Sequence, residues 1–220
     1  AIIFDWDGTL VDCADWVLAA HNHVRKNMDK PLWSKDDIFG CSSLSTRELY
    51  PEIYGENAQA AMSLLHDYTS KYNLEGSNPY HGAKELLEFL VEQNQFLGVV
   101  SNKRHEPLNE LIDHMKWRSY FVSTIGAGYA KRDKPHSSPL MTCIIQIDSN
   151  LTAKDILYVG DTETDLMTAK NTECDVVFIQ SDKPRPDLIK KYSPNYSFNN
   201  LKEFTAAVTM SNVSSNRQAI

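Results

Sequence analysis

The sequence lacks the marks of membrane, secreted and zinc-binding proteins. Its four cysteines, Cys13, Cys41, Cys143 and Cys174, are scattered without CxxC spacing, so neither a zinc site nor a disulfide framework is indicated. No apolar run approaches the ~20 residues that a membrane helix needs. No signal-peptide pattern opens the chain, although Ala1 begins directly on an apolar run without an initiator Met, so a few residues are expected to precede it. We therefore expect a cytoplasmic protein with no membrane partner.

Positive charge is also scarce. The chain has 22 Lys and Arg against 29 Asp and Glu, a formal net charge of −7. Nucleic-acid binding normally needs a basic stripe that displaces counterions, so we expect no nucleic acid as partner. What is present is ordinary for a globular protein: 220 residues, of which 42% are hydrophobic and 10% aromatic, suit one large or two small domains with a real core.

The chain opens on a short apolar run that ends at two carboxylates, Asp5 and Asp7. This pattern predicts a buried strand followed by a tight turn at Gly8. The two acids would converge on one spot if the strand continued through them, because strand residues two apart point the same way. Carboxylates that close repel unless a cation intervenes, and hard oxygen ligands of this kind suit Mg²⁺. An acidic turn after an edge strand explains the same residues equally well.

The rest of the chain alternates between strand and helix patterns. Buried-strand patterns occupy 96–100, 121–125, 156–159 and 176–179, with helical spacing between them. This alternation predicts an α/β fold with a Rossmann-like parallel sheet and helices on both faces. Right-handed crossovers place the carboxyl ends of the strands along one edge, where ligands bind in such sheets. The polar residues expected at that edge, because they follow strand ends, are Asp5, Asp7, Ser101, Asn102, Asp161 and Asp165.

One stretch departs from this alternation by carrying only helical patterns. Residues 15–78 contain two amphipathic stretches and, from Ser34 to Asp37, a capping-box-like helix start. We therefore expect an all-helical domain inserted after the first strand, with a catalytic core formed by 1–14 and 79–210. The polar segment 211–220 is expected to be a loosely ordered tail.

The opening motif, Asp-Trp-Asp-Gly-Thr-Leu-Val-Asp at 5–12, resembles that of the haloacid dehalogenase superfamily. Three later stretches, at 101–103, 131–135 and 160–165, match in the same order. Most members are Mg²⁺-dependent phosphatases, so the resemblance implies Mg²⁺ as cofactor and a small phosphorylated metabolite as substrate. The helical insert resembles the cap of phosphoglycolate-phosphatase-like members. Whether the protein is a monomer or a homodimer cannot be read from the sequence.

The resemblance also assigns roles to the four aspartates. Asp5 would attack phosphorus and form an aspartyl-phosphate. Asp7 would act as general acid and then base, with its backbone carbonyl on the metal. Asp161 would be a direct Mg²⁺ ligand and Asp165 a direct or water-mediated one. The bland interpretation of Asp161 and Asp165, a well-capped helix start, is the better one without the first motif.

Three further residues would bind the phosphoryl group. The Ser101 hydroxyl and the Asn102 backbone N–H would contact its oxygens, and Lys134 would supply a fixed cation. Lys131 and Arg132 compete with Lys134 for that role, since all three lie in one loop. A solvated basic loop is the plain alternative.

Several readings of the function stay open. Asp7 argues against dehalogenases and phosphonatases within the family, and Val17 or Leu18 stands where mutases carry a His. A phosphatase acting on phosphoglycolate, a sugar phosphate or a nucleotide is therefore preferred, with a pyrophosphatase or phosphomutase as alternatives. A non-catalytic phosphate-sensing or scaffold protein on the same fold is the alternative from another class.

Within the insert, Arg47 and the Ser42–Ser43 pair are candidates for contact with the organic end of the substrate. A surface Arg and a helix cap explain them as well. Gly8 and the segments 13–15 and 78–82 are the expected hinges of a closing cap.

Overall fold

The computed structural model describes residues 1–41, 44–181 and 184–217. Within them, the larger sheet has six strands in the order β5-β4-β1-β6-β7-β8, and every neighbouring pair is parallel. The strands are β1 (Ile2–Phe4), β4 (Leu97–Arg104), β5 (Phe121–Ala127), β6 (Leu157–Gly160), β7 (Asp175–Ile179) and β8 (Tyr196–Phe198). The predicted parallel α/β fold is confirmed. Since β1 lies between β4 and β6, the strand order reverses at β1, which is where such sheets bind ligands.

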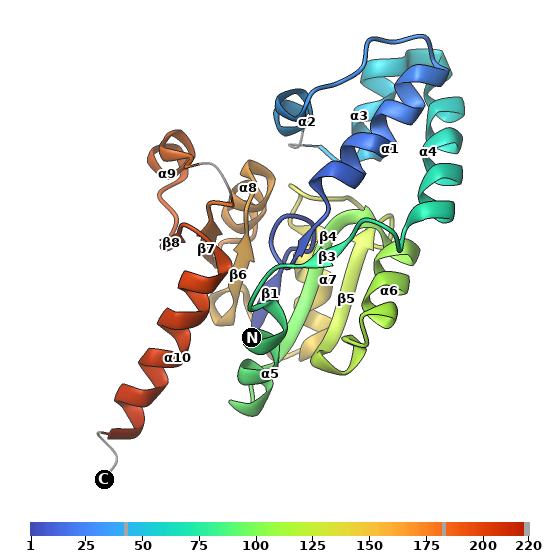
Figure 1. Cartoon of the computed structure of the whole chain (residues 1–220). Helices are drawn as coiled ribbons and strands as arrows, with labels where there is room; N and C mark the ends of the chain where they lie inside the picture. The colour runs from blue at the N-terminus through green and yellow to red at the C-terminus, as the bar shows by residue number, and fades with distance from the viewer. Residues whose placement is uncertain (42–43, 182–183, 218–220) are drawn as a thin grey trace.

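Helices cover both faces of this sheet (Figure 1). Alternate residues of β1 enter two separate cores, because Phe4 packs on one face and Ile3 on the other. The first core is formed with α5 (Ala83–Glu92), α6 (His105–His114) and α10 (Leu201–Arg217), and the second with α7 (Ser138–Ile147), α8 (Glu163–Thr172) and α9 (Pro186–Tyr192). Both β1 side chains are completely buried, so truncating Phe4 to Ala would cost about 3–5 kcal/mol.

Helix α10 extends into 211–220, the segment whose loose order stays a prediction. Helix α10 continues to Arg217 and so occupies most of 211–220, while residues 218–220 lie outside the described part. Leu201 and Phe204 anchor the start of this helix in the core.

The described residues of the insert form helices and connecting loops, and two short strands join the insert to the core. These strands, β2 (Val11–Asp12) and β3 (Asn78–Pro79), pair antiparallel. Between them lie α1 (Ala14–Asn27), α2 (Lys35–Cys41), α3 (Thr46–Tyr54) and α4 (Ala58–Tyr72). Figure 1 shows these helices beyond the carboxyl ends of the sheet strands. Their own small core is made of Val24, Tyr50, Tyr54 and Ala61.

Sequence reasoning found most of these helices but missed α3. The Ser34 and Asp37 side chains each accept a hydrogen bond from the other residue's backbone, at 3.3 and 2.7 Å, as the capping-box pattern indicated. Helix α3 escaped because Pro51 lies inside it, and Pro normally ends a helix.

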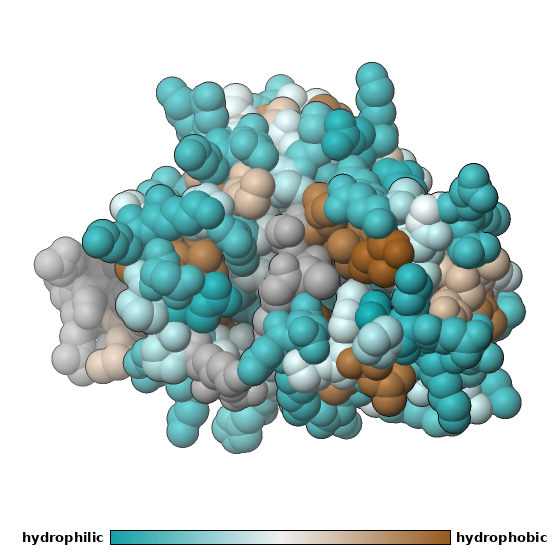
Figure 2. Space-filling model, turned by 90° about the horizontal axis from the view of Figure 1, so that it is seen from above, coloured by the Kyte–Doolittle hydropathy of each residue, from teal (hydrophilic) through white to brown (hydrophobic). Residues whose placement is uncertain are grey.

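The view onto the insert from above is mainly hydrophilic, with smaller hydrophobic areas (Figure 2). Over the described residues, no helix combines the length and apolar character needed to cross a membrane.

Candidate active site

Asp5 lies directly beyond β1, at the reversal of the strand order. Its backbone N–H still donates to the Val159 carbonyl of β6 at 2.8 Å, so the residue is held by the sheet although the strand has ended. The side chain is 5% exposed and lines a cavity. The Lys134 ammonium donates to Asp5 Oδ1 at 2.6 Å. The sheet therefore presents one carboxylate, already paired with a cation, to the cavity.

Three carboxylates gather at this point. One oxygen from each of Asp5, Asp161 and Asp165 lies within 4.8 Å of the other two. The Asp161 oxygens accept hydrogen bonds from Thr9 Oγ1 at 2.7 Å and Ser181 Oγ at 3.3 Å, which fix the orientation of this side chain. Hard carboxylate oxygens in such a group are the donors that Mg²⁺ prefers. The donor set present in the chain thus fits the ion that the motif implied.

Gly8 is required for Asp161 to come this close. A Cβ at position 8 would lie 2.2 Å from Asp161 Oδ2, and the φ of Gly8 is +91°. Both the space and the left-handed backbone exclude a side chain. The Gly of the opening motif is therefore explained by the approach of Asp161, a contact across the sheet edge.

Both carboxylate oxygens of Asp165 already accept hydrogen bonds from other residues of the protein. Its Oδ1 accepts from Lys134 Nζ at 2.8 Å and Tyr158 Oη at 2.9 Å. Its Oδ2 accepts from the Thr162 side chain at 2.6 Å and from the backbone N–H groups of Thr162 and Asp161 at 2.9 and 3.2 Å. A carboxylate has about four lone-pair sites, so these donors fill it. This geometry favours Asp165 as the residue that orients Lys134 and the loop of Asp161.

Lys134 is held at both its side chain and its backbone. Its ammonium is 3% exposed and contacts Asp5, Asp165 and the Tyr158 hydroxyl. The Asn102 side chain accepts from the Lys134 N–H at 3.0 Å and donates to the Lys134 carbonyl at 3.1 Å. Of its two rivals, Arg132 points to Glu48 of α3 at 3.3 Å and Lys131 is exposed. The loop thus brings Lys134, rather than either rival, to the carboxylates.

Burial and mutual repulsion govern the protonation of this cluster. Burial, only partly offset by Lys134, raises the pKa of Asp5 to about 7. Burial and the neighbouring Asp5 raise the pKa of Asp161 well above its usual value. For Asp165, burial alone would raise the pKa, but the Lys134 ammonium and the hydrogen bonds from Thr162 together outweigh burial and lower it. The same attraction raises the pKa of Lys134 against the effect of burial, so the lysine stays charged. Full ionisation would give the cluster more negative charge than one ammonium can balance, so Asp5 and Asp161 hold their protons to higher pH than an ordinary carboxyl group.

Asp7 lies at the edge of the same cavity, in a separate set of contacts. Its Oδ1 is 3.2 Å from the Lys103 ammonium and accepts from Cys13 Sγ at 3.0 Å. Burial alone would lower the pKa of Lys103, but Asp7 and Cys13 outweigh it and raise that pKa. Lys103 also lies 4.7 Å from the ring centre of Trp16, on α1. Sequence reasoning missed Lys103, although it directly follows Ser101 and Asn102 in one of the matched motifs.

Ser101 and Asn102 lie within β4, Ser101 as the last residue of its buried part, and both line the cavity. Ser101 is 4% exposed, and its hydroxyl accepts from the Lys103 backbone N–H at 3.1 Å. The Asn102 side chain instead forms hydrogen bonds with the backbone of Lys134. Both residues are thus at the sheet edge with the aspartates, within one wall of the cavity.

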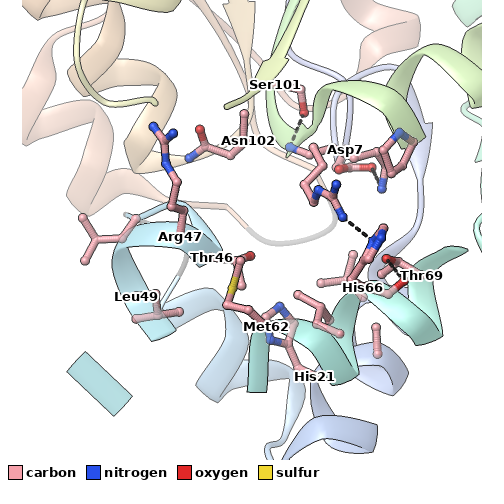
Figure 3. A pocket seen from close by; sticks show the side chains of 18 of the residues that line it. Asp7, His21, Thr46, Arg47, Leu49, Met62, His66, Thr69, Ser101 and Asn102 are labelled. Carbon is pink, nitrogen blue, oxygen red and sulfur yellow. Dashed lines mark hydrogen bonds and ion pairs between the residues drawn. The ribbon is translucent and has the colours of Figure 1, made fainter. Parts of the chain in front are cut away.

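The cavity lies between the sheet edge and the helical insert, both of which line it, and has a volume of about 550 Å³. Figure 3 shows Asp7, Ser101 and Asn102 on one side and Thr46, Met62 and His21 on the other. Arg47 of α3 also lines it and reaches Asp133, the neighbour of Lys134, at 3.1 Å. The candidate pair Ser42–Ser43 lies outside the described residues.

The family to which this sequence is similar agrees with the parallel α/β fold and with the carboxylates and buried lysine at its strand ends. Residues 2–179 match the family model of the haloacid dehalogenase-like hydrolases. The chain belongs to this family.

Two curated relatives and one solved structure illustrate the similarity. The chain is 20% identical over 208 residues to the pyrophosphatase PpaX of Listeria welshimeri, covering 94% of this chain and 95% of that protein. It is 26% identical over 174 residues to a phosphoglycolate phosphatase of Xanthomonas campestris, covering 77% and 78%. A haloacid dehalogenase-like family hydrolase from Streptococcus pneumoniae superposes with a TM-score of 0.81 at 18% identity, covering 94% and 97%. This last likeness shows the fold.

Proposed function

We propose that this protein is an Mg²⁺-dependent phosphatase that hydrolyses a small phosphate monoester through an aspartyl-phosphate on Asp5. One observation carries the proposal: Asp5 faces a cavity at the sheet edge with Asp161 and the Lys134 ammonium beside it. A phosphate monoester is slow to hydrolyse because its dianion repels a nucleophile. A fixed cation beside a carboxylate nucleophile is what that reaction needs.

The reaction would proceed in two displacements. A carboxylate oxygen of Asp5 forms a bond to phosphorus while the bond to the leaving oxygen breaks, and Asp7 donates its proton to that oxygen. Asp7 then removes a proton from a water molecule, whose oxygen attacks phosphorus and releases inorganic phosphate from Asp5. Mg²⁺ held by Asp5, Asp161 and the Asp7 carbonyl would supply positive charge against the phosphoryl oxygens. Ser101 and Lys134 would bind those oxygens throughout.

The relatives support a phosphatase and bear on its substrate. One carries the name pyrophosphatase and another phosphoglycolate phosphatase. We prefer a monoesterase to a pyrophosphatase because the cavity extends well beyond the carboxylates, to Thr46, Met62 and His21. A small phosphorylated metabolite in the cytoplasm is the proposed substrate. The buried thiols of Cys13 and Cys143 and the half-buried Cys174 are free, which suits a reducing compartment.

We also propose that the insert, residues 15–78, acts as a cap over the site. Arg47 would sense the organic part of the substrate, since it lines the cavity while it contacts Asp133 beside Lys134. A closed cap would exclude water during the first displacement.

Turnover of p-nitrophenyl phosphate and of a panel of phosphorylated metabolites, with and without Mg²⁺, tests the proposal. Asp5→Asn should abolish Mg²⁺-dependent release, while Asp187→Asn, which alters an exposed carboxylate of α9, should leave it unchanged. Absence of release from every compound, with phosphate binding retained, would favour the sensor or scaffold function instead.

A further inference from the structure

The cavity is larger than the smallest candidate substrates need. Its volume is about 550 Å³. Phosphoglycolate and pyrophosphate contain only about nine non-hydrogen atoms each, so either would leave much of this space unfilled. A larger leaving group would be needed to occupy the rest.

Side chains of α1, α3, α4 and the loops that join them form an apolar and aromatic wall facing the carboxylates: His21, Trp33, Leu44, Leu49, Met62 and Leu65. The polar side chains of Arg47, Gln59 and His66 line the cavity as well. In Figure 3, Leu49, Met62 and His21 lie across the cavity from Asp7 and Ser101. All six side chains are only partly buried by the protein itself. This wall therefore retains apolar surface that a ligand in the cavity would cover.

The aromatic part of this wall is held in place before any ligand binds. The Asn22 side chain donates to the Trp33 carbonyl at 2.9 Å and accepts from the Trp33 N–H at 2.7 Å. The Arg25 guanidinium lies 4.5 Å from the ring centre of Trp33. His21 is 3.1 Å from the Tyr50 hydroxyl, and its ring centre is 5.3 Å from that of Trp33. A preformed wall costs little ordering on binding.

The wall is also uncharged. Burial, aided by Arg25, lowers the pKa of His21 to about 4, so its imidazole is neutral at neutral pH. Among the described residues, the cations that line the cavity each already pair with a carboxylate: Arg47 with Asp133, Lys103 with Asp7, Arg104 with Glu106 and Lys134 with Asp5. A substrate with a second anionic group would therefore have to break an existing ion pair.

We propose that the substrate is a phosphate monoester whose leaving group carries a neutral aromatic or heteroaromatic ring, seated against the wall of His21, Trp33 and Met62. The inference rests on the proposed phosphatase function and adds its substrate class. Short acidic phosphates and pyrophosphate are poor substrates on this view, because they reach neither the ring wall nor an unpaired cation.

Benzyl phosphate and ethyl phosphate form the test pair, since their leaving alcohols are similar in acidity and differ mainly in the ring. A methylene in an apolar pocket is worth about 10–200-fold in kcat/KM, so the ring should favour benzyl phosphate by about 100-fold or more. Phosphoglycolate and pyrophosphate should rank with ethyl phosphate. Values for benzyl and ethyl phosphate within about threefold of each other would overturn the inference and leave the phosphatase function standing. Hydrolysis of none of these compounds in the presence of Mg²⁺ would overturn both.

Variants of the wall separate ring binding from general damage. Met62→Ser should lower kcat/KM for benzyl phosphate by about tenfold and that for ethyl phosphate by less than about twofold. The matched control Met141→Ser, on α7 and outside the cavity, should change neither. Ser63→Trp, at an exposed position of α4 that lines the cavity, should narrow it and affect only the ring substrate. Equal losses on both esters in Met62→Ser and Ser63→Trp would refute the assignment of the wall.

Discussion

Adding Mg²⁺ to the metal-free protein should raise its melting temperature, because the ion would relieve repulsion within the carboxylate cluster. Asp5, Asp161 and Asp165 face one ammonium, that of Lys134, so full ionisation leaves two negative charges unbalanced in a buried place. Two unit charges about 4 Å apart interact by about 4 kcal/mol at an effective dielectric constant of 20. That is a large part of the whole stability of a typical domain, which is about 5–15 kcal/mol.

The size of the effect follows from linkage. A ligand at 100 times its Kd stabilises the folded state by about 2.7 kcal/mol. For a domain of this length each kcal/mol moves the melting temperature by about 2–4 °C, so we expect a shift of about 5–11 °C. Differential scanning fluorimetry of EDTA-treated protein, titrated with Mg²⁺ at constant ionic strength, measures it.

Asp161→Asn provides the decisive control. This variant removes one charge from the cluster but keeps an acceptor for the Thr9 hydroxyl, which bonds Asp161 Oδ1. Its metal-free form should melt no lower than the wild type, and its response to Mg²⁺ should be lost. An undiminished Mg²⁺ shift in the variant, or no shift in the wild type, would refute the metal site.

The shift should also depend on pH in a defined direction. The folded-state pKa of Asp5 is raised to about 7 from an ordinary value of 3.8, so the folded protein binds more protons than the unfolded chain between these limits. Stability from this group is therefore present below about pH 4 and lost as pH rises through 7, by up to about 4 kcal/mol. Mg²⁺ must displace that proton, so its apparent affinity should rise by at least about tenfold per pH unit below pH 7, and the raised pKa of Asp161 should extend the rise above pH 7. A pH-independent affinity between pH 5 and 7 would contradict this assignment.

Three substitutions test other parts of the site. Gly8→Ala should lower kcat/KM by about 100-fold or more, because its Cβ would lie 2.2 Å from Asp161 Oδ2, whereas circular dichroism should show the fold retained. Lys134→Met should lower the free energy of unfolding in urea by about 3–5 kcal/mol, because it leaves buried carboxylates without their cation; an unchanged value without Mg²⁺ would contradict the pairing. Arg47→Ala should cost about 1–3 kcal/mol in the same assay, since buried Asp133 loses its charged partner and keeps the Gly128 backbone N–H, and a loss below about 0.5 kcal/mol would count against that contact.

The sequence predicted the meeting of Asp5 and Asp161 for a reason that does not depend on detail. Both follow apolar strand patterns, and parallel strands joined by right-handed crossovers end at one edge. Adjacent β1 and β6 then bring the two carboxylates together across more than 150 residues of chain. Local patterns could not decide between Lys134 and Arg132, since side-chain direction in a loop depends on its partners. Asn102 holds the backbone of Lys134, while Glu48 of the insert engages Arg132.

Contacts between the core and the insert could not be predicted either, because they too depend on partners that are distant in the sequence. Arg47 meets Asp133 only because α3 lies over the loop that carries Lys134, and α3 itself was concealed by Pro51. One sequence fixes neither the orientation of an inserted domain nor the pairs it forms. The cavity wall, built from the insert, therefore became visible only in the structure.

The position of the proposed proton donor depends on both parts of the molecule. Asp7 accepts from the thiol of Cys13, the residue that precedes α1, and pairs with Lys103 near the end of β4. The Lys103 ammonium lies over the ring of Trp16, whose indole N–H donates to the Tyr72 carbonyl at the end of α4 at 2.9 Å. Movement of α1 relative to the sheet must therefore change contacts on Asp7 itself. If the insert closes as proposed, closure would therefore also move the proposed acid, through the contacts of Cys13 and Lys103 with the Asp7 carboxyl group.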